Sequence, residues 1–190
     1  MPFPRSPELM SRDDSALLVV DVQEKLIGLI PEHQRIVWNI GRLIDAAGIL
    51  GVPVAGTEQY PQGLGETLPQ LREKLPAWGE KRDFSCLQCE DIFTQWRDAQ
   101  VFNVLVVGIE THVCVLQTAL DLLATGFHVH VAIDAVGSRF DTDRQTALRR
   151  LESSGATLST TETAIFEWCA TSTAPEFRQI SKLVRETMPE

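Results

Sequence analysis

Residues Ala16–Val22 read ALLVVDV, an apolar run of strand length with a single charge at Asp21. Successive side chains of a strand point to opposite faces, so this strand is apolar on both faces, as in a parallel sheet that is covered on both sides. The next stretch repeats apolar residues at helical spacing and ends at glycines: Ile36, Ile40, Leu43, Ile44 and Ala47, then Gly48 and Gly51. Together, these two stretches predict a strand followed by an amphipathic helix.

The same alternation continues along the rest of the chain. Further strands are expected at Val52–Gly56, Val104–Val107, Val129–Ile133 and Ala156–Ser159, and helices at Asp91–Ala99, Val113–Thr125, Thr142–Ser153 and Pro175–Met188. The segment Thr57–Gly65 (TEQYPQGLG) is too rich in turn formers to predict either element. The pattern predicts an α/β fold, a single-domain doubly wound, mainly parallel sheet with helices on both faces. Residues 1–14 are expected to form a peripheral N-terminal arm, and residues 15–190 the domain.

The composition limits the partners that are expected. Among 190 residues, Asp and Glu number 26 against 17 Lys and Arg, which gives a formal net charge of −9, and no basic cluster stands out. Neither nucleic acid nor a membrane surface is therefore an expected partner. No apolar stretch is long enough to span a bilayer, and the N-terminus lacks a signal-peptide core. The expected location is cytoplasmic, where the four cysteines, Cys86, Cys89, Cys114 and Cys169, stay thiols.

Parallel sheets place their sites at the carboxyl ends of the strands, which directs attention to Cys114. This cysteine ends the segment Gly108–Cys114 (GIETHVC), where a helix is expected to begin with Thr111 as its cap. Unpaired N–H groups in the first turn of a helix stabilise a thiolate and, during attack on a carbonyl, an oxyanion. A buried structural thiol is the equally weighted alternative.

Two charged residues are candidate partners of the thiol. Asp21 ends the first strand, where a carboxylate is costly unless it is paired or functional, and it is suited to take the proton of Cys114. Lys81 is suited to pair with Asp21 and favour the thiolate. Taken alone, Asp21 also fits a structural ion pair, and Lys81 also fits a solvated surface charge. His112, two residues before Cys114, is the rival base.

Other motifs carry weaker signals. Cys86-Leu-Gln-Cys89 is a CxxC, but it lacks the second half that a zinc site needs, and two ordinary thiols are the favoured interpretation. His128 and His130 alternate in a strand pattern, which favours packing over metal binding. No phosphate-binding loop or GxGxxG pattern is present, so no cofactor is expected.

In this order, the residues resemble the isochorismatase-like cysteine hydrolases, a superfamily that includes nicotinamidases. Three pieces carry the resemblance: Leu17–Gln23 (LLVVDVQ), Lys81 with Phe84-Ser85, and Val107–Val115 (VGIETHVCV). The resemblance implies an Asp–Lys–Cys triad of Asp21, Lys81 and Cys114. It also implies a cis peptide at Ile109–Glu110, with the N–H groups of Glu110 and Cys114 as the oxyanion hole. The implied reaction is hydrolysis of a C–N, amide-like bond in a small molecule through a thioester, in an enzyme that forms homo-oligomers.

Two departures from the family narrow the expected activity. Nicotinamidases bind a metal through an Asp-x-His motif after the second strand, whereas Thr57–Gly65 has no histidine, so no metal is expected. True isochorismatases lack the cysteine, so Cys114 argues against their vinyl ether hydrolysis. Gln23, Tyr60 and His112 are candidate substrate-binding residues. A thiol redox or sensing protein, and an interaction protein that kept the fold, are the alternatives, and the role of the Glu110 side chain stays open.

Overall fold

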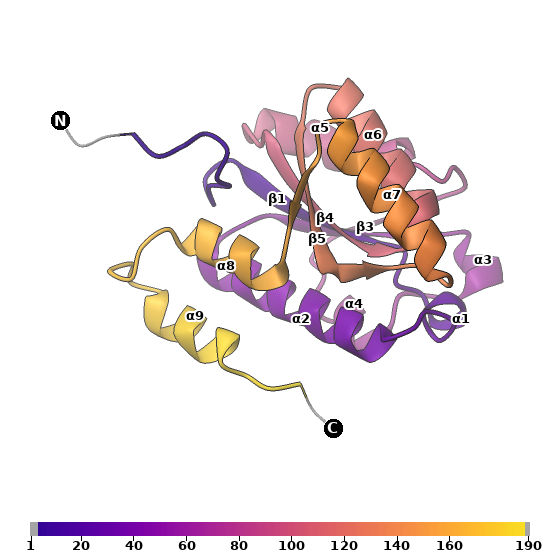
Figure 1. Cartoon of the computed structure of the whole chain (residues 1–190), viewed down its shortest axis with the longest axis horizontal. Helices are drawn as coiled ribbons and strands as arrows, with labels where there is room; N and C mark the ends of the chain where they lie inside the picture. The colour runs from indigo at the N-terminus through magenta and orange to yellow at the C-terminus, as the bar shows by residue number, and fades with distance from the viewer. Residues whose placement is uncertain (1–3, 189–190) are drawn as a thin grey trace.

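In a computed structural model of the chain, which describes residues 4–188, six strands form one sheet in the order β3-β2-β1-β4-β5-β6 (Figure 1). Every neighbouring pair runs parallel. From β1, the chain first adds β2 and β3 on one side and then β4, β5 and β6 on the other. This change of side is the doubly wound arrangement. The α/β fold expected from the sequence is confirmed. The strands are β1 Ser15–Val20, β2 Val54–Gln59, β3 Trp78–Lys81, β4 Asn103–Ile109, β5 His128–Gly137 and β6 Thr157–Ser159.

Helices cover both faces of the sheet, with α2, α8 and α9 on one side and α5, α6 and α7 on the other (Figure 1). Between residues 4 and 188, no helix combines the length and the apolar character needed to cross a membrane. The helices are α1 Glu24–Ile27, α2 His33–Leu50, α3 Pro61–Leu64, α4 Pro69–Arg72, α5 Glu90–Asp98, α6 Leu116–Ala124, α7 Asp141–Ser153, α8 Thr161–Cys169 and α9 Phe177–Val184, with a 3-10 turn η1 Cys86–Gln88 and a π-helix η2 Thr111–Val115.

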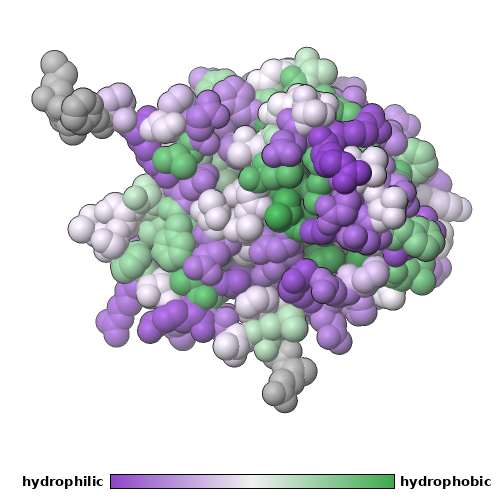
Figure 2. Space-filling view, in the orientation of Figure 1, coloured by the Kyte–Doolittle hydropathy of each residue, from purple (hydrophilic) through white to green (hydrophobic). Residues whose placement is uncertain are grey.

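The sheet divides the apolar core into two layers, as the two-faced first strand predicts. Leu17 and Val19 pack with α2 and α8, while Leu18 and Val20 pack with α5 and α6. Each such side chain contributes about 1.5–3 kcal/mol when it is fully buried. The polar faces of the helices point outward, as on α7 at the upper right of Figure 2. Burial on both faces fixes β1 at the centre of the sheet.

Two expectations about elements were wrong, and two further elements were not predicted. Thr57–Gly65 is not irregular throughout, because β2 continues to Gln59 and α3 follows from Pro61. The edge strand β3 and the helix α8 were not predicted. β3 is polar and has only one buried residue, Lys81. The C-terminal helix is shorter than Pro175–Met188 and spans Phe177–Val184.

The N-terminal segment is anchored to α8. Arg5 donates to the carbonyl oxygens of Met10 and Glu167, at 3.0 Å and 2.8 Å. The Met10 N–H donates to the Glu167 carboxylate at 3.0 Å, and the Met10 side chain is fully buried in the core. The described part of this arm therefore packs against the domain through both polar and apolar contacts.

Candidate active site

The candidate site lies between β1 and β4, where the strand order reverses. Val20 of β1 is aligned with Gly108 of β4, so Asp21 and Ile109 emerge side by side at the carboxyl edge. Gly108 has φ of 115°, and a Cβ there would lie 2.1 Å from the carbonyl oxygen of Val20. Only glycine fits this approach of the two strands. The close approach brings the ends of β1 and β4 together.

Asp21 is fully buried, and both of its carboxylate oxygens have partners. Oδ2 accepts a hydrogen bond from Lys81 Nζ at 2.7 Å, and Oδ1 accepts one from the Thr57 hydroxyl at 2.8 Å. These partners come from β3 and β2, so two neighbouring strands fix the orientation of the carboxylate. An unpaired carboxylate at this depth would be strongly destabilising.

Lys81 is a buried cation held by several acceptors. Besides Asp21, its Nζ donates to Gln59 Oε1 at 2.8 Å and to the Phe84 carbonyl at 3.1 Å. Burial lowers the pKa of Lys81, but the charge of Asp21, with smaller contributions from Cys86 and Cys114, outweighs burial and raises the pKa above its ordinary value. Lys81 is therefore a permanent positive charge beside Asp21 and not the solvated surface lysine of the alternative interpretation.

Gln23 braces the loops around this ion pair. Its amide nitrogen donates to the carbonyl oxygens of Gln59 and Gly65, at 3.0 Å and 2.6 Å, and its amide oxygen accepts from the Gln59 N–H at 2.8 Å. Gln59 in turn donates to the Arg82 carbonyl at 2.7 Å. The side chain of Gln23 thus joins the ends of β1 and β2, and its contacts among the described residues are structural ones.

Cys114 lies in the π-helix η2, directly after β4, and only 7% of its surface is exposed. Burial and then the nearby Asp21 carboxylate raise the pKa of the Cys114 thiol, and Lys81 opposes them only in part. Burial and the Asp21 charge therefore outweigh the stabilisation that a helix start was expected to give to the thiolate. The resting group is a thiol. The expected cap was also wrong, because Thr111 Oγ1 is buried without a hydrogen-bond partner in the described structure.

The peptide bond Ile109–Glu110 is cis, as the resemblance implied. The Glu110 carboxylate points to Arg139 and not to the thiol: it accepts from the Arg139 backbone N–H at 3.0 Å and from Nε at 3.1 Å and 3.2 Å. This forked contact ties the turn before Cys114 to the loop after β5. The positive charge of Arg139 balances the charge that Glu110 brings to the site.

The other two substrate-binding candidates lie at the surface around the site. His112 Nδ1 is 3.0 Å from Ser138 Oγ, and Nε2 is 3.8 Å from Asp143 Oδ2, so the ring is oriented toward the loop after β5 and toward α7. These contacts leave Asp21 as the better-placed base. Tyr60 is 42% exposed, and the guanidinium of Arg82 lies 3.9 Å from its ring centroid.

Cys86 is a second thiol of the site, which the sequence analysis treated as ordinary. It is completely buried, its Sγ is 3.3 Å from Thr57 Oγ1, and its N–H donates to Thr118 Oγ1 at 2.9 Å. Burial, and then the charge of Asp21, raise the pKa of Cys86 to about 12. Cys89 is half-buried with its thiol toward the Glu80 carbonyl, and the cysteines are free.

This raised pKa predicts a loss of stability in alkali. Between pH 9 and 12 the folded protein keeps the Cys86 proton that the unfolded chain releases, so the free energy of unfolding falls as the pH rises. The full contribution is about 4 kcal/mol. Denaturant unfolding at pH 8 to 10.5 should show a shallower decline for Cys86→Ala than for wild type. Cys169→Ala, which removes a thiol on the other face of the sheet, is the control; parallel declines for Cys86→Ala and wild type would contradict the prediction.

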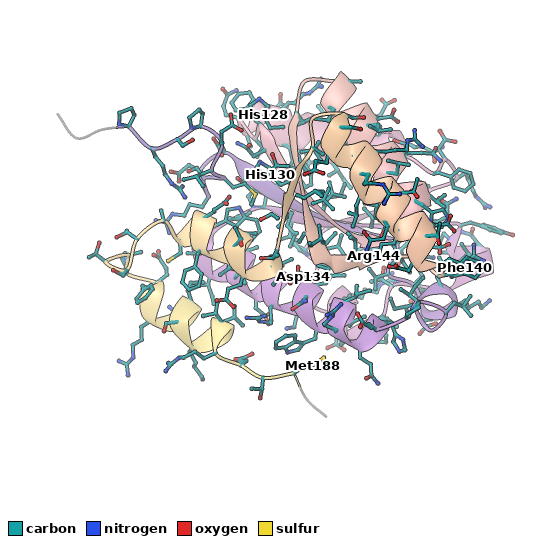
Figure 3. The ribbon with its side chains drawn as sticks, viewed as in Figure 1. His128, His130, Asp134, Phe140, Arg144 and Met188 are labelled. Atoms are coloured by element: carbon teal, nitrogen blue, oxygen red, sulfur yellow. The ribbon has the colours of Figure 1, made fainter. Side chains whose placement is uncertain are left out.

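Three further polar side chains, Asp134, His128 and His130, come from β5 (Figure 3). Asp134 accepts hydrogen bonds from the N–H and hydroxyl of Thr161, at 2.8 Å and 3.0 Å, and so holds the start of α8. His128 and His130 lie at the opposite end of β5 from Phe140, and His130 contacts Asn103. A hollow of about 720 Å³ runs along α2 and α4 to Met188, but it is not lined by the triad. In residues 4–188, no group of three or more metal-binding side chains is found.

The family model described as the isochorismatase domain matches residues 15–163. The chain belongs to the isochorismatase family. Isochorismatase domain-containing protein 2 of Bos taurus is 44% identical over 179 residues, which cover 93% of this chain and 85% of that protein. The Homo sapiens protein of the same name is 41% identical over 179 residues, with the same coverage.

Solved structures of the isochorismatase fold agree with this membership. The MAR1 ribonuclease of Caenorhabditis elegans is 43% identical with a TM-score of 0.88, covering 96% of this chain and 95% of that chain. The YcaC protein of Escherichia coli, an octameric hydrolase of unknown specificity, has a TM-score of 0.85 at 23% identity, covering 95% and 92%. The second likeness shows the fold alone. Membership in the isochorismatase family supports a hydrolase fold and confirms the resemblance inferred from the sequence.

Proposed function

We propose that this member of the isochorismatase family is a cysteine hydrolase that cleaves a C–N, amide-like bond of a small molecule through a thioester on Cys114. The observation that carries the proposal is the buried ion pair of Asp21 and Lys81, 2.7 Å apart, whose two charges act on the Cys114 thiol in η2, the element that follows the adjacent strand β4. A buried ion pair is expensive to maintain for stability alone. A base, a cation and a nucleophile gathered at the strand ends meet the requirements of acyl transfer.

In the proposed first step, Asp21 takes the proton of the Cys114 thiol while the sulfur attacks the carbonyl carbon. Because the raised pKa of Cys114 keeps it a thiol at rest, proton transfer accompanies the attack instead of preceding it. The backbone N–H groups of Glu110 and Cys114 are the proposed donors to the oxyanion. The C–N bond then breaks, the amine leaves with the proton from Asp21, and a thioester remains.

In the second step, water attacks the thioester carbonyl and gives its proton to Asp21. The C–S bond breaks, the acid is released, and the proton returns to the Cys114 sulfur. Lys81 keeps Asp21 ionised between the two steps, because its charge favours the carboxylate. No cofactor enters this scheme. Tyr60 and His112 are the proposed substrate contacts, and Gln23 is proposed to support them by bracing the loops around the site.

The test is to trap the acyl-enzyme. Incubation with a panel of small primary amides and carbamoyl compounds, followed by acid quenching, should add the acyl mass to the peptide that contains Cys114. The adduct should be absent in Asp21→Asn, which lacks the base, and present in Cys89→Ala, which removes the exposed half of the CxxC. Mass addition on Cys86 or Cys89, or the formation of a Cys86–Cys89 disulfide during turnover, would instead support the redox alternative.

A ribonuclease is a second candidate, because the structurally similar protein from C. elegans is named as one. Phosphodiester cleavage would need surface cations for the RNA backbone, whereas this chain has a net charge of −9 and the lysine of its site is buried. We therefore rank it below the amide hydrolase. Degradation of a labelled RNA that disappears in both Cys114→Ala and Asp21→Asn would reverse this order, whereas activity that survives in both would indicate a contaminating nuclease.

We also infer a homo-oligomer in the cytoplasm, without nucleic acid or a membrane as partner. Large apolar side chains are exposed in loops, Leu29 after α1 and Tyr60, Phe84 and Phe140 after strands, and a second copy would cover part of this surface. Reduced thiols suit the cytoplasm. Sedimentation velocity at micromolar concentration tests the assembly: a single species of about 21 kDa would contradict it.

A further inference from the structure

A second line of buried groups leads to Asp21, through Thr57 on β2 and Cys86 in η1. The Thr57 hydroxyl lies between Asp21 Oδ1, at 2.8 Å, and the Cys86 sulfur, at 3.3 Å. Thr57 is 1% exposed and Cys86 is fully buried, so water does not compete for either contact. The Cys86 N–H is fixed by Thr118 Oγ1, which holds the thiol in place.

The direction of these hydrogen bonds follows from the number of protons. A hydroxyl has one proton, and the ionised Asp21 carboxylate can only accept, so the Thr57 proton points to Asp21. The Cys86 thiol must then donate to Thr57 Oγ1. With a pKa of about 12, Cys86 keeps its proton at neutral pH and remains a donor. The result is a one-way chain from Cys86 through Thr57 to Asp21, in which each bond strengthens the next.

We propose that Thr57 and Cys86 are positioning residues, forming a relay that orients the Asp21 carboxylate and restrains its tendency to take the Cys114 proton. A donor to the ionised carboxylate stabilises that form and makes it a weaker base. The relay therefore favours return of the proton to the leaving amine over retention on Asp21. The inference rests on the proposed function, because it assigns a role to residues around the proposed base.

The titratable groups that act on Asp21 are Lys81 on β3, Cys86 on η1, Cys89 and Cys114. Burial, and then the charge of Asp21, raise the pKa of the Cys114 thiol, so the thiol is the main form of Cys114 at neutral pH. The minor form, with the thiolate and a protonated Asp21, is the one that iodoacetamide alkylates. The neutral alkylation rate of Cys114 therefore reports how strongly Asp21 attracts that proton, with no need for a substrate.

The experiment measures the iodoacetamide rate of Cys114 at pH 7 by peptide mass spectrometry. Thr57→Val, which keeps the shape and removes the hydroxyl, should raise the rate about tenfold, the change expected when a base loses one hydrogen bond from a neutral donor. Thr57→Ser should restore the wild-type rate. Cys86→Ala, which leaves Thr57 in place, should give a smaller increase and serves as the second variant if Thr57→Val does not fold.

A double-mutant cycle separates the relay from simple loosening of the site. In the Asp21→Asn background, Thr57→Val should have no effect on the alkylation rate, since no carboxylate remains to be tuned. An equal increase in both backgrounds, or no increase in Thr57→Val and Cys86→Ala, would overturn the relay. An unchanged rate in Asp21→Asn alone would instead overturn Asp21 as the base, and with it the proposed function.

Discussion

Cys114→Ala should lose hydrolysis of the amide that acylates the wild-type enzyme, by at least about 10⁴-fold in kcat, while the fold stays intact. Without the sulfur no thioester forms, and direct attack by water lacks an activated nucleophile. The side chain is small, so its removal should cost only about 1 kcal/mol of stability. Steady-state kinetics with the purified protein, together with thermal unfolding, measure both quantities.

Cys169→Ala is the matched control for this variant. It also removes a buried thiol next to the sheet, but from the opposite core layer. Its kcat should equal that of wild type. Retention of more than about a tenth of wild-type kcat in Cys114→Ala would show that Asp21 activates water directly and would refute covalent catalysis by Cys114. Equal losses in both variants would indicate damage to the core instead of the chemistry.

The sequence predicted the central strands through their two apolar faces and several helices through their amphipathic spacing. Ala16–Val22 and Val104–Val107 are apolar because helices cover them on both sides, and this signal located the central strands within two or three residues. The edge strand β3 has one buried residue. The end of β2 was not predicted, because Thr57–Gly65 is rich in turn-forming residues. β3 carries little hydrophobic pattern, so periodicity did not find it, whereas the other edge strand, β6, lies within the expected range Ala156–Ser159.

The candidate site shows the same division. Asp21, Lys81 and Cys114 were selected by the family resemblance and by the rule that sites lie at the carboxyl ends of parallel strands. The structure places Asp21 and Lys81 in direct contact. Thr57 and Cys86 were missed, because an isolated threonine and half of a CxxC carry no spacing signal for a contact made across three elements. The one available signal was that Thr57, like Asp21, lies at the carboxyl end of a strand.

The Glu110 side chain is a different case. Its partner, Arg139, is 29 residues away, and only the register between β4 and β5 brings their loops together. Local sequence shows a charge beside a nucleophile, but it does not show the charge that balances it. The raised pKa of the Cys114 thiol was not predicted for a related reason: the helix position was visible in the sequence, whereas the depth of burial was not.

Lys81→Met should lower the free energy of unfolding by about 3–5 kcal/mol, the largest stability change expected here for a single side chain. Methionine fills similar volume, but Asp21 is left as a buried carboxylate without its cation. For a chain of this length, the midpoint of thermal unfolding should fall by roughly 6–20 °C. Urea denaturation and calorimetry measure the change. Lys74→Met is the control, because Lys74 and Asp45 form an equally short pair that is 41% exposed on each side, and its loss should cost less than about 1 kcal/mol.

The double variant Asp21→Asn with Lys81→Met identifies the source of this cost. If the cost comes from the orphaned carboxylate, removing its charge as well should restore much of the lost stability, so the two effects should not add. The double variant should still be inactive, since the base is gone. Stability would then have been separated from catalysis: an isochorismatase-family fold without the ion pair would persist, and the pair would be maintained for the chemistry at Cys114. Additive losses would instead assign the cost to packing around Lys81 and its carbonyl acceptors, and the ion pair would then be a structural feature of the fold.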